Sequence, residues 1–409
     1  MRKDEFYAAA RDDLLGPLDG VRVLDITTTW AGPMCTCVLA DFGADVVKVE
    51  EPEGDVVRRL PPMLPNGESF AHVAVNRNKR CISLDLRVDE GRDILRRLVA
   101  ETDILVENFR PGTLAKWGLG YRDLCEVKPD LIYVSISGWG QFGPNHARAG
   151  YDPLAQAASG FLSLNGSTDG DPVKAPTFLG DDLAGLHGAL GALAALWHRQ
   201  RTGEGQHVDV ALLDALLFQS NGYLTLGALE IPTRRMGNEY VFAAPANIYA
   251  CRDGRVYLGI LLDSHWQRLA DTIGRPDLRD TLASTAARIA KRSELNGLMA
   301  DWCGERTVTQ VEAELTAAQL AVARVRGYED AARDEHVLAR DMLQDVVQPD
   351  GDALPITGPA VKFSRTPTRV RSAAPEPGAH DDEVLGDLGL SAAAIAALRE
   401  RGIVRPRSQ

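Results

Sequence analysis

DITTTWAGPMCTCVLADFGADVVKVEE, residues 25–51, is the stretch that decides the fold. The apolar, β-branched run 21–26 predicts a strand that leads into it. Apolar residues then recur near helical spacing, at Met34, Val38, Leu39 and Phe42. Gly43 stands where glycine commonly ends a helix, and the valines within 46–49 predict a second strand. A strand, a helix and a strand in this order predict a parallel sheet covered by helices.

The turn after the first strand lacks the glycines of a dinucleotide-binding site. Thr27–Pro33 does not match the G-x-G-x-x-G fingerprint, so Glu50 is interpreted as a strand-end residue rather than a ribose-binding acid. Gly138–Gly143 does match the fingerprint and follows the strand-like run 131–135, but the next helical run starts only near Tyr151. A nicotinamide- or flavin-dependent dehydrogenase is therefore one alternative. A flexible glycine loop beside a substrate is the favoured interpretation.

The composition indicates a globular chain of two domains. The chain has 409 residues, 45% of them hydrophobic, and no run near the ~20 apolar residues of a membrane span. The N-terminal run 1–15 is charged and lacks the apolar region of a signal peptide, so we expect a cytoplasmic protein with no membrane partner. The six cysteines are scattered and the eight histidines show no H-E-x-x-H spacing. We therefore expect neither disulfides nor a metal site.

The net charge of −12 argues against nucleic acid as a partner. Basic residues are nonetheless concentrated in one stretch that contains a single acid, Glu68: they are Arg58, Arg59, Arg77, Lys79 and Arg80. Arg110, Lys116 and Arg122 follow. Because the field near a cleft matters more than the total charge, such a stretch favours a polyanionic ligand. A solvated, ligand-free face is the alternative.

Strand-like and helix-like runs alternate along the first half of the chain, as α/β proteins require. The predicted strands after the opening unit are 81–84, 104–107 and 131–135, and the apolar run 183–199 predicts a buried helix. The pattern changes near residue 230, where a loop-rich stretch precedes a strand at 255–261. We interpret the region up to about residue 335 as a second, smaller domain.

Several segments together resemble the class III CoA-transferases, a family that includes formyl-CoA transferase, carnitine CoA-transferase and the 2-methylacyl-CoA racemases. The similar runs span most of residues 21–240, in family order: DITTTWAGP (25–33), DFGADVVKVEEPEGD (41–55), NRNKRCISLDL (76–86), ENFRPGTLAKWGLGY (107–121), SISGWGQFGP (135–144), GYDPLAQAASG (150–160), GDDLAGLHGALGALAALWHRQRTGEGQHVDVALLDALL (180–217) and RRMGN (234–238). The C-terminal third is similar only loosely.

The resemblance implies a Rossmann-like large domain with a parallel sheet, built from residues 1–228 and completed by 336–409. It implies a small inserted α+β domain at 229–335 and a homodimer whose subunits interlock like links of a chain. Coenzyme A would lie on the large domain. The expected partners are an acyl-CoA and a carboxylate as substrates, and no tightly bound cofactor is expected.

The resemblance also implies site residues. In formyl-CoA transferase a single aspartate carries the chemistry, and Asp169, in a loop reading G-x-x-D-G, is similar to it, although composition alone predicts an ordinary turn there. Positions similar to CoA-contacting ones are Thr28, Thr29, Trp30, Ala31, Leu84, Asn108, Phe109 and Lys116. Ser137 stands where formyl-CoA transferase has a lysine near CoA. We expect the CoA phosphates to meet Arg58, Lys79 and Arg80, and the backbone N–H groups around Gly140 to stabilise oxyanions.

Two departures from the family bear on the reaction. The racemases have a histidine where this chain has Tyr151, and it works with an aspartate similar to Asp182. Tyrosine does not readily take an α-proton, so CoA transfer is favoured, with a 2-methylacyl-CoA racemase as the alternative that His146 keeps open. The glycine-run loop of formyl-CoA transferase is missing from 237–245, so we expect a larger acid such as succinate. Its second carboxylate would meet arginines, with Arg77, Arg234 and Arg235 as candidates. A CoA-binding relative without activity is a further alternative, against which the retained Asp169 argues.

Overall fold

The computed structural model describes residues 1–348 and 351–406, and the chain separates into two compact units. The first unit comprises Met1–Phe161, Ala175–Leu224 and His336–Gln409. The second unit comprises Leu162–Lys174 and Thr225–Glu335. The predicted domain boundaries stay a prediction. The two units differ from them mainly in segment 162–174, which the sequence did not separate from its neighbours.

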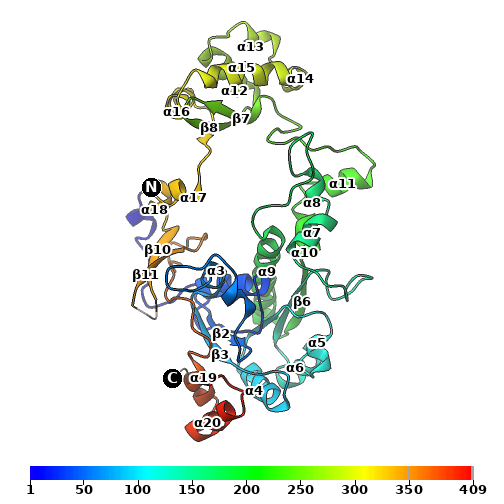
Figure 1. Ribbon diagram of the computed structural model, residues 1–409, viewed down its shortest axis with the longest axis vertical. Coiled ribbons are helices and arrows are strands. Elements are labelled where there is room, and N and C mark those ends of the chain that lie inside the picture. Colours follow the sequence, from blue (N-terminus) through cyan, green and yellow to red (C-terminus); the bar gives the residue numbers. More distant parts are fainter. Residues whose placement is uncertain (349–350, 407–409) are drawn as a thin grey trace. The chain divides into compact units, whose positions relative to one another are not determined.

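Six parallel strands form the sheet of the first unit and confirm the predicted α/β class. They are β1 (Arg22–Asp25), β2 (Asp45–Glu50), β3 (Lys79–Ser83), β4 (Ile104–Glu107), β5 (Ile132–Ser137) and β6 (Gln206–Ala211). Their spatial order is β3-β2-β1-β4-β5-β6, so the order reverses between β1 and β4. The two edge strands, β3 and β6, are labelled in Figure 1. Ligands of open parallel sheets bind outside the carboxyl ends of the strands at such a switch point.

Helices cover both faces of this sheet, because successive strand residues point to opposite sides. The helices α2 (Ala31–Asp41) and α9 (Leu179–Thr202) pack with Val23 and Ile104. On the opposite face, Leu24 and Leu105 lie in a second core cluster with three helices, α4 (Asp89–Ala100), α19 (Asp381–Asp387) and α20 (Ala392–Glu400). The C-terminal helices therefore complete the core that the N-terminal strands begin.

Shorter elements complete the first unit. They are α1 (Lys3–Phe6), the 3-10 turn η1 (Val56–Arg59), α3 (Phe70–Asn76), α5 (Thr113–Lys116), α6 (Tyr121–Val127), α7 (Asp152–Ala158), α10 (Leu212–Phe218), and an antiparallel hairpin of β10 (Leu343–Val347) and β11 (Ala353–Thr357). The chain passes between the units at α8 (Phe161–Leu164), between Lys174 and Ala175, at α11 (Tyr223–Ala228) and at α18 (Glu335–Ala339).

The second unit has a smaller antiparallel sheet of β7 (Ala246–Cys251), β8 (Gly254–Gly259) and β9 (Val322–Arg324). Its helices are α12 (Asp263–Thr272), α13 (Leu278–Thr281), α14 (Thr285–Ala290), α15 (Arg292–Gly304), α16 (Val308–Ala317) and α17 (Tyr328–Ala331). Trp266, Met299 and Leu315 are fully buried in its core. The strand predicted at 255–261 corresponds to β8.

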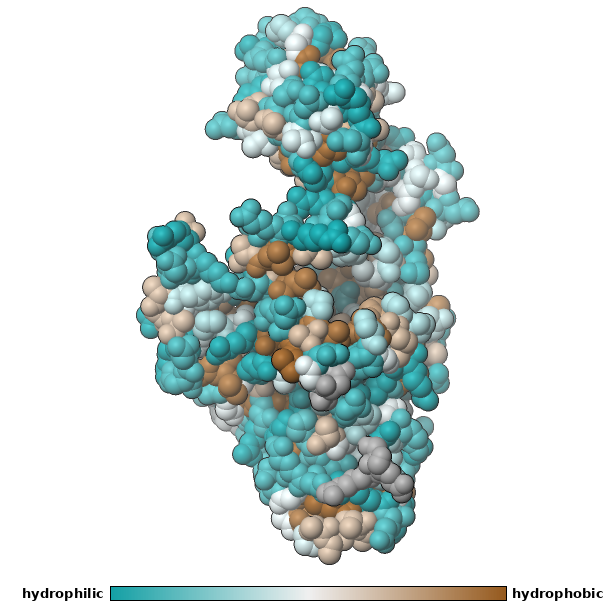
Figure 2. Space-filling view, turned by 60° about the vertical axis from the view of Figure 1, so that its left-hand side comes forward, coloured by the Kyte–Doolittle hydropathy of each residue, from teal (hydrophilic) through white to brown (hydrophobic). Residues whose placement is uncertain are grey.

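The surface is largely hydrophilic with apolar patches (Figure 2). One run of exposed apolar side chains follows a single face of α9, because Leu186, Leu190 and Trp197 lie four and seven residues apart and are 48%, 64% and 61% exposed. Within the described residues, no helix is long and apolar enough to cross a membrane.

Buried charges join the central strands. Asp25, at the end of β1, accepts a hydrogen bond from Lys79 Nζ at 2.9 Å and one from Thr36 Oγ1 at 2.6 Å, and all three side chains are buried. Burial raises the pKa of Asp25, but the ammonium groups of Lys48 and Lys79 bring it below its ordinary value. The carboxylate therefore stays charged and ties β1 to β3 and α2.

Replacing Asp25 with alanine leaves two buried ammonium groups without their shared partner. We expect Asp25→Ala to lower the free energy of unfolding by about 3–5 kcal/mol in urea titrations. Asp45, whose side chain is 44% exposed and pairs with Arg80, is the matched control. Asp45→Ala should cost less than about 1 kcal/mol. Equal losses in the two variants would contradict this account of the buried charges.

Candidate active site

The loops at the carboxyl edge of the sheet enclose a cavity of about 270 Å³. Each of the strands β1 to β4 contributes a lining residue at or just beyond its carboxyl end, namely Thr28, Glu50, Leu84 and Phe109. The remaining lining residues are Ile26, Thr27, Val49, Glu51, Glu53, Gly54, Asp55, Val56, Arg59, Leu86, Arg87 and Trp117. The cavity thus lies at the switch point that the strand order defines.

Two loops are locked together across this switch point. The backbone N–H of Thr28 donates to Asn108 Oδ1, and Asn108 Nδ2 donates back to the Thr28 carbonyl, both at 2.8 Å. Phe109 packs edge-to-face on Trp117 with ring centroids 5.9 Å apart. The structure therefore brings together Thr28, Leu84, Asn108 and Phe109, four of the residues predicted from the sequence.

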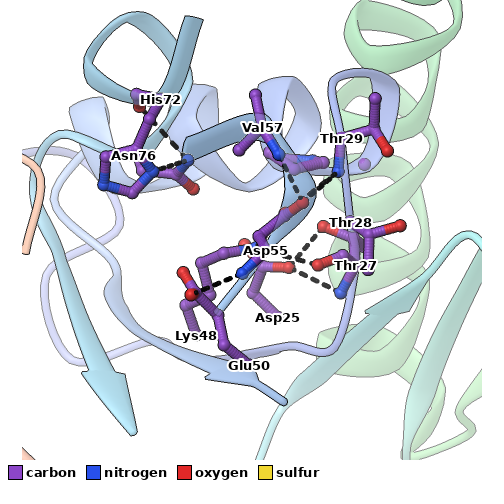
Figure 3. Close-up of polar contacts among 12 residues, drawn as sticks. Asp25, Thr27, Thr28, Thr29, Lys48, Glu50, Asp55, Val57, His72 and Asn76 are labelled. Atoms are coloured by element: carbon purple, nitrogen blue, oxygen red, sulfur yellow. Dashed lines mark hydrogen bonds and ion pairs between the residues drawn. The ribbon is translucent and has the colours of Figure 1, made fainter. Parts of the chain in front are cut away.

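Ionic and hydrogen-bonded contacts fix the walls of the cavity, and those around Glu50, Asp55 and the Thr27–Thr29 turn are drawn in Figure 3. Arg58 donates two hydrogen bonds of 2.8 Å to the carboxylate of Glu50 and one of 2.9 Å to the Pro375 carbonyl. Burial raises the pKa of Glu50, but the bonds from Arg58 bring it down to about 2. The guanidinium of Arg58 is therefore committed to protein partners, which weakens its predicted role at a phosphate.

Three other basic residues of the predicted phosphate and carboxylate sites are committed as well. The Lys79 side chain is fully buried and its ammonium bonds to Asp25, Asn76 and the Pro33 carbonyl. Arg80 lies at the start of β3, the opposite edge of the sheet, and pairs with Asp45 and Glu383. Arg77 is bonded to Asp41 at 2.6 Å. Lys79, Arg80 and Arg77 are therefore paired with protein carboxylates and are not available to a substrate's phosphate or carboxylate.

Other cationic side chains lie nearer to the cavity. Arg59 and Arg87 line the cavity, whereas Lys116 is exposed one residue before the lining Trp117. Among the described residues Arg59 has no ion pair, whereas Arg87 donates two hydrogen bonds to Asp85, at 2.8 and 3.1 Å, and lies 3.8 Å from Glu53. Arg59 is therefore the more available of the two cations. Arg59 belonged to the basic stretch seen in the sequence. Arg87 could have been found from the sequence, because it lies three residues after Leu84, the last residue of a predicted strand.

The glycine loop 138–143 is organised by its own contacts. Gly140 has a φ of 86°, and its N–H donates to Ser137 Oγ at 3.0 Å. The next N–H, that of Gln141, donates to Asp209 at 2.9 Å. Both N–H groups thus have partners, so the predicted oxyanion role of Gly140 requires the loop to rearrange. The Ser137 hydroxyl likewise has a partner within the loop, because it accepts this hydrogen bond from Gly140.

The loop of Asp169 belongs to the second unit. Arg235 donates to the carbonyls of Ser167 and Gly170 at 3.2 and 2.6 Å, and so fixes the loop on both sides of Asp169. Asp169 itself is exposed. Arg235 is therefore a loop-holding residue rather than the predicted carboxylate clamp, and Arg234 remains a candidate for that clamp.

Three aspartates gather in the first unit, where α7 and α9 begin. Asp152 accepts from the Gly180 N–H at 2.6 Å and from Gln156 at 2.7 Å, while Asp182 accepts from Trp30 Nε1 at 2.7 Å. Burial, with the charges of Asp152 and Asp182, raises the pKa of Asp181 to about 7. Within the described part of the chain, the Asp181 side chain makes no hydrogen bond. Strongly shifted carboxylates of this kind are typical of reacting groups.

Asp181 was not among the residues predicted from the sequence. The family resemblance pointed to Asp182, and the structure places both Asp181 and Asp182 in the first turn of α9. Only the fold brings Asp152 and Trp30 to this turn, so the signal available in the sequence was the paired acids alone.

A buried acid also supports the loop after β4. Glu107 accepts from the Phe109 N–H at 2.8 Å, and burial raises the pKa of Glu107 to about 7. The folded protein therefore binds the Glu107 proton more tightly than the unfolded chain does. Stability from this proton is full below the unfolded pKa of about 4.3 and is lost as the pH rises through 7.

We expect Glu107→Gln, which does not titrate, to remove that pH dependence. Relative to the variant, the wild type should lose on the order of 2 kcal/mol of unfolding free energy between pH 5 and pH 8, measured in urea. Glu126→Gln, at an exposed acid, is the control and should leave the pH profile unchanged. Parallel profiles for wild type and Glu107→Gln would show that Glu107 ionises normally.

Comparison with known proteins agrees with this architecture. The model of CoA-transferase family III matches residues 18–381. Succinyl-CoA:mesaconate CoA-transferase of Haloarcula hispanica is 38% identical over 387 residues, which cover 92% of this chain and 97% of that protein. The beta subunit of succinyl-CoA–L-malate CoA-transferase of Chloroflexus aurantiacus is 36% identical, with 95% and 98% covered. A CAIB/BAIF family protein from Brucella suis has a similar crystal structure, with a TM-score of 0.81, 34% identity and coverage of 91% and 99%.

The chain therefore belongs to CoA-transferase family III and is an enzyme of that class. This confirms the resemblance recognised in the sequence.

Proposed function

We propose that this enzyme moves CoA from a dicarboxylic acyl-CoA, such as succinyl-CoA, to a second carboxylic acid. The observation that carries the proposal is the cavity at the switch point, closed by the Thr28–Asn108 pair and flanked by Arg59 and Arg87. Arg59 supports a phosphate of CoA at this wall, because it makes no ion pair among the described residues. Of the four carboxylates that also line the cavity, Glu50 is paired with Arg58 and Asp55 with Lys48. The named substrates of the two relatives above support succinyl-CoA as the donor.

The proposed reaction proceeds through a protein carboxylate. The carboxylate attacks the thioester carbonyl, forming an acyl–aspartyl anhydride and releasing the CoA thiolate. The thiolate attacks the aspartyl carbonyl, which gives an aspartyl-CoA thioester and frees the first acid. The acceptor carboxylate attacks this thioester, and the thiolate then takes the new acyl group and restores the aspartate. Holding CoA by its nucleotide end keeps the thiolate at high effective concentration.

Two aspartates compete for the nucleophilic role. Asp169 is the prediction from the sequence, and its loop is held by Arg235. Asp181 has the stronger structural support: it lies in the same unit as the cavity, it is partly buried, and its raised pKa makes its carboxylate more basic. Its neighbour Asp182 is bonded to Trp30, two residues beyond the lining Thr28. We therefore place Asp181 ahead of Asp169.

The assignment of the nucleophile is tested with isosteric amides. Asp181→Asn should lower kcat more than about 10³-fold, whereas Asp169→Asn should change it less than about 10-fold. Because Asp181 must be ionised to attack, kcat/KM of the wild type should rise as the pH increases towards about 7. Peptide mapping after incubation with succinyl-CoA should find CoA attached at Asp181. An adduct at Asp169 would restore the original assignment, and an adduct at neither would reject the covalent route.

The reaction itself is tested by following all thioesters in D₂O by mass spectrometry, with pools of acyl-CoAs and carboxylic acids. We expect succinyl-CoA to be consumed and a new acyl-CoA to form. Deuterium entering a 2-methylacyl-CoA without any new thioester would establish the racemase alternative. Tight binding of NAD(H) without either change would favour the dehydrogenase alternative.

We also propose that the enzyme is a homodimer. The exposed apolar face of α9, with Leu186, Leu190 and Trp197, supports this, because monomeric proteins seldom leave such a continuous apolar face in water. The interlocked arrangement rests on the family resemblance alone.

A further inference from the structure

Thr29 adopts a backbone conformation that its side chain disfavours. Its φ is 68°, in the left-handed region, where β-branched residues are rare outliers. Such a conformation costs roughly 1–3 kcal/mol and persists only where the surroundings enforce it. Thr29 follows Thr28 in the loop that lines the cavity (Figure 3), so the strain lies at the proposed binding site.

The buried carboxylate of Asp55 enforces this conformation. Its two oxygens lie 3.2 and 3.0 Å from the Thr29 N–H, and Oδ1 also accepts from the Val57 N–H at 3.0 Å. The Asp55 side chain is 1% exposed. A carboxylate with few water contacts and two backbone donors holds those donors firmly.

Lys48 holds the other side of the same loop. Its Nζ lies 3.6 Å from Asp55 Oδ2 and donates to the Thr27 carbonyl at 2.8 Å. Burial lowers the pKa of Lys48, but Asp25, Asp55 and Glu50 raise it above its ordinary value, so the ammonium remains charged. Thr28 is thus held between the fixed Thr27 carbonyl and the fixed Thr29 N–H. The side chain of Asn108 also bonds to the backbone N–H and carbonyl of Thr28.

We propose that Asp55 and Lys48 form a buried clamp that positions the Thr27–Thr29 turn for acyl-CoA, with Asp55 as a positioning residue. This inference rests on the proposed function, namely that the nucleotide end of acyl-CoA binds in this cavity. The clamp acts on acyl-CoA affinity and not on the chemical step, because among the described residues neither Asp55 nor Lys48 bonds directly to an aspartate of α9.

The test combines Asp55→Asn with Thr29→Gly. Asp55→Asn should raise KM and Kd for succinyl-CoA about 10- to 100-fold, with kcat changed less than about threefold and KM for the acceptor acid unchanged. Glycine adopts a φ of 68° without strain, so adding Thr29→Gly should recover at least about threefold of the lost affinity. A purely structural role would lower stability and the active fraction, and would show no rescue by glycine.

Asp41→Asn is the matched control. Asp41 is buried and bonded to Arg77 and Asn78, which are not among the residues that line the cavity. Its amide variant should lose stability in urea and keep the wild-type KM for succinyl-CoA. Lys48→Gln, which keeps a donor near the Thr27 carbonyl, provides a milder second variant with an expected KM increase of about threefold.

The outcomes separate this inference from the proposed function. If wild-type enzyme transfers CoA but Asp55→Asn and Lys48→Gln keep its KM for succinyl-CoA, the clamp is rejected and the function stands. The same conclusion follows if Asp41→Asn raises that KM equally. If the wild type neither binds CoA by calorimetry nor forms new thioesters, the proposed function fails and the clamp fails with it.

Discussion

Two buried lysines and the carboxylate between them are the constraint on which the first unit depends. Asp25 joins β1 to β3 through Lys79, to α2 through Thr36, and to the following loop through the Thr27 N–H and hydroxyl. A buried charge is tolerable only with such partners, so these groups specify one arrangement of strand, helix and loop. The conformation of the Thr27–Thr29 turn beside the cavity is therefore fixed by buried ion pairs and hydrogen bonds rather than by glycines.

The strand order places the turn held by Asp25 beside the cavity. Because β1 and β4 are neighbours in space but not in sequence, the loops that follow them meet, and Thr28 and Asn108 bond reciprocally at that point. Helix α9 packs on α2 and brings Asp181 and Asp182 toward the same turn, with the bond from Trp30 to Asp182 as the direct link. One edge of the sheet thereby brings together residues that are 152 positions apart in the chain, namely Trp30 and Asp182.

Local patterns in the sequence predicted the elements well, because strands, helices and their ends are encoded by nearby residues. The β1–α2–β2 unit and the parallel sheet were confirmed, and Thr28, Leu84, Asn108 and Phe109 do lie together. Charge patterns predicted the site less well. Lys79 is cationic in the sequence, but its partner Asp25 is 54 residues away and no local pattern links them. Asp181 was overlooked for the same reason, since its neighbour Asp152 comes from another helix.

Hydrogen–deuterium exchange of the enzyme with and without CoA is the measurement that tests whether the nucleotide end of CoA binds in this cavity. It reports the place of binding without relying on any variant. We expect slower exchange on CoA binding in residues 26–31, 54–59 and 107–110, the loops around the cavity. Protection confined to other segments, with these three loops unchanged, would contradict a CoA site at the switch point between β1 and β4.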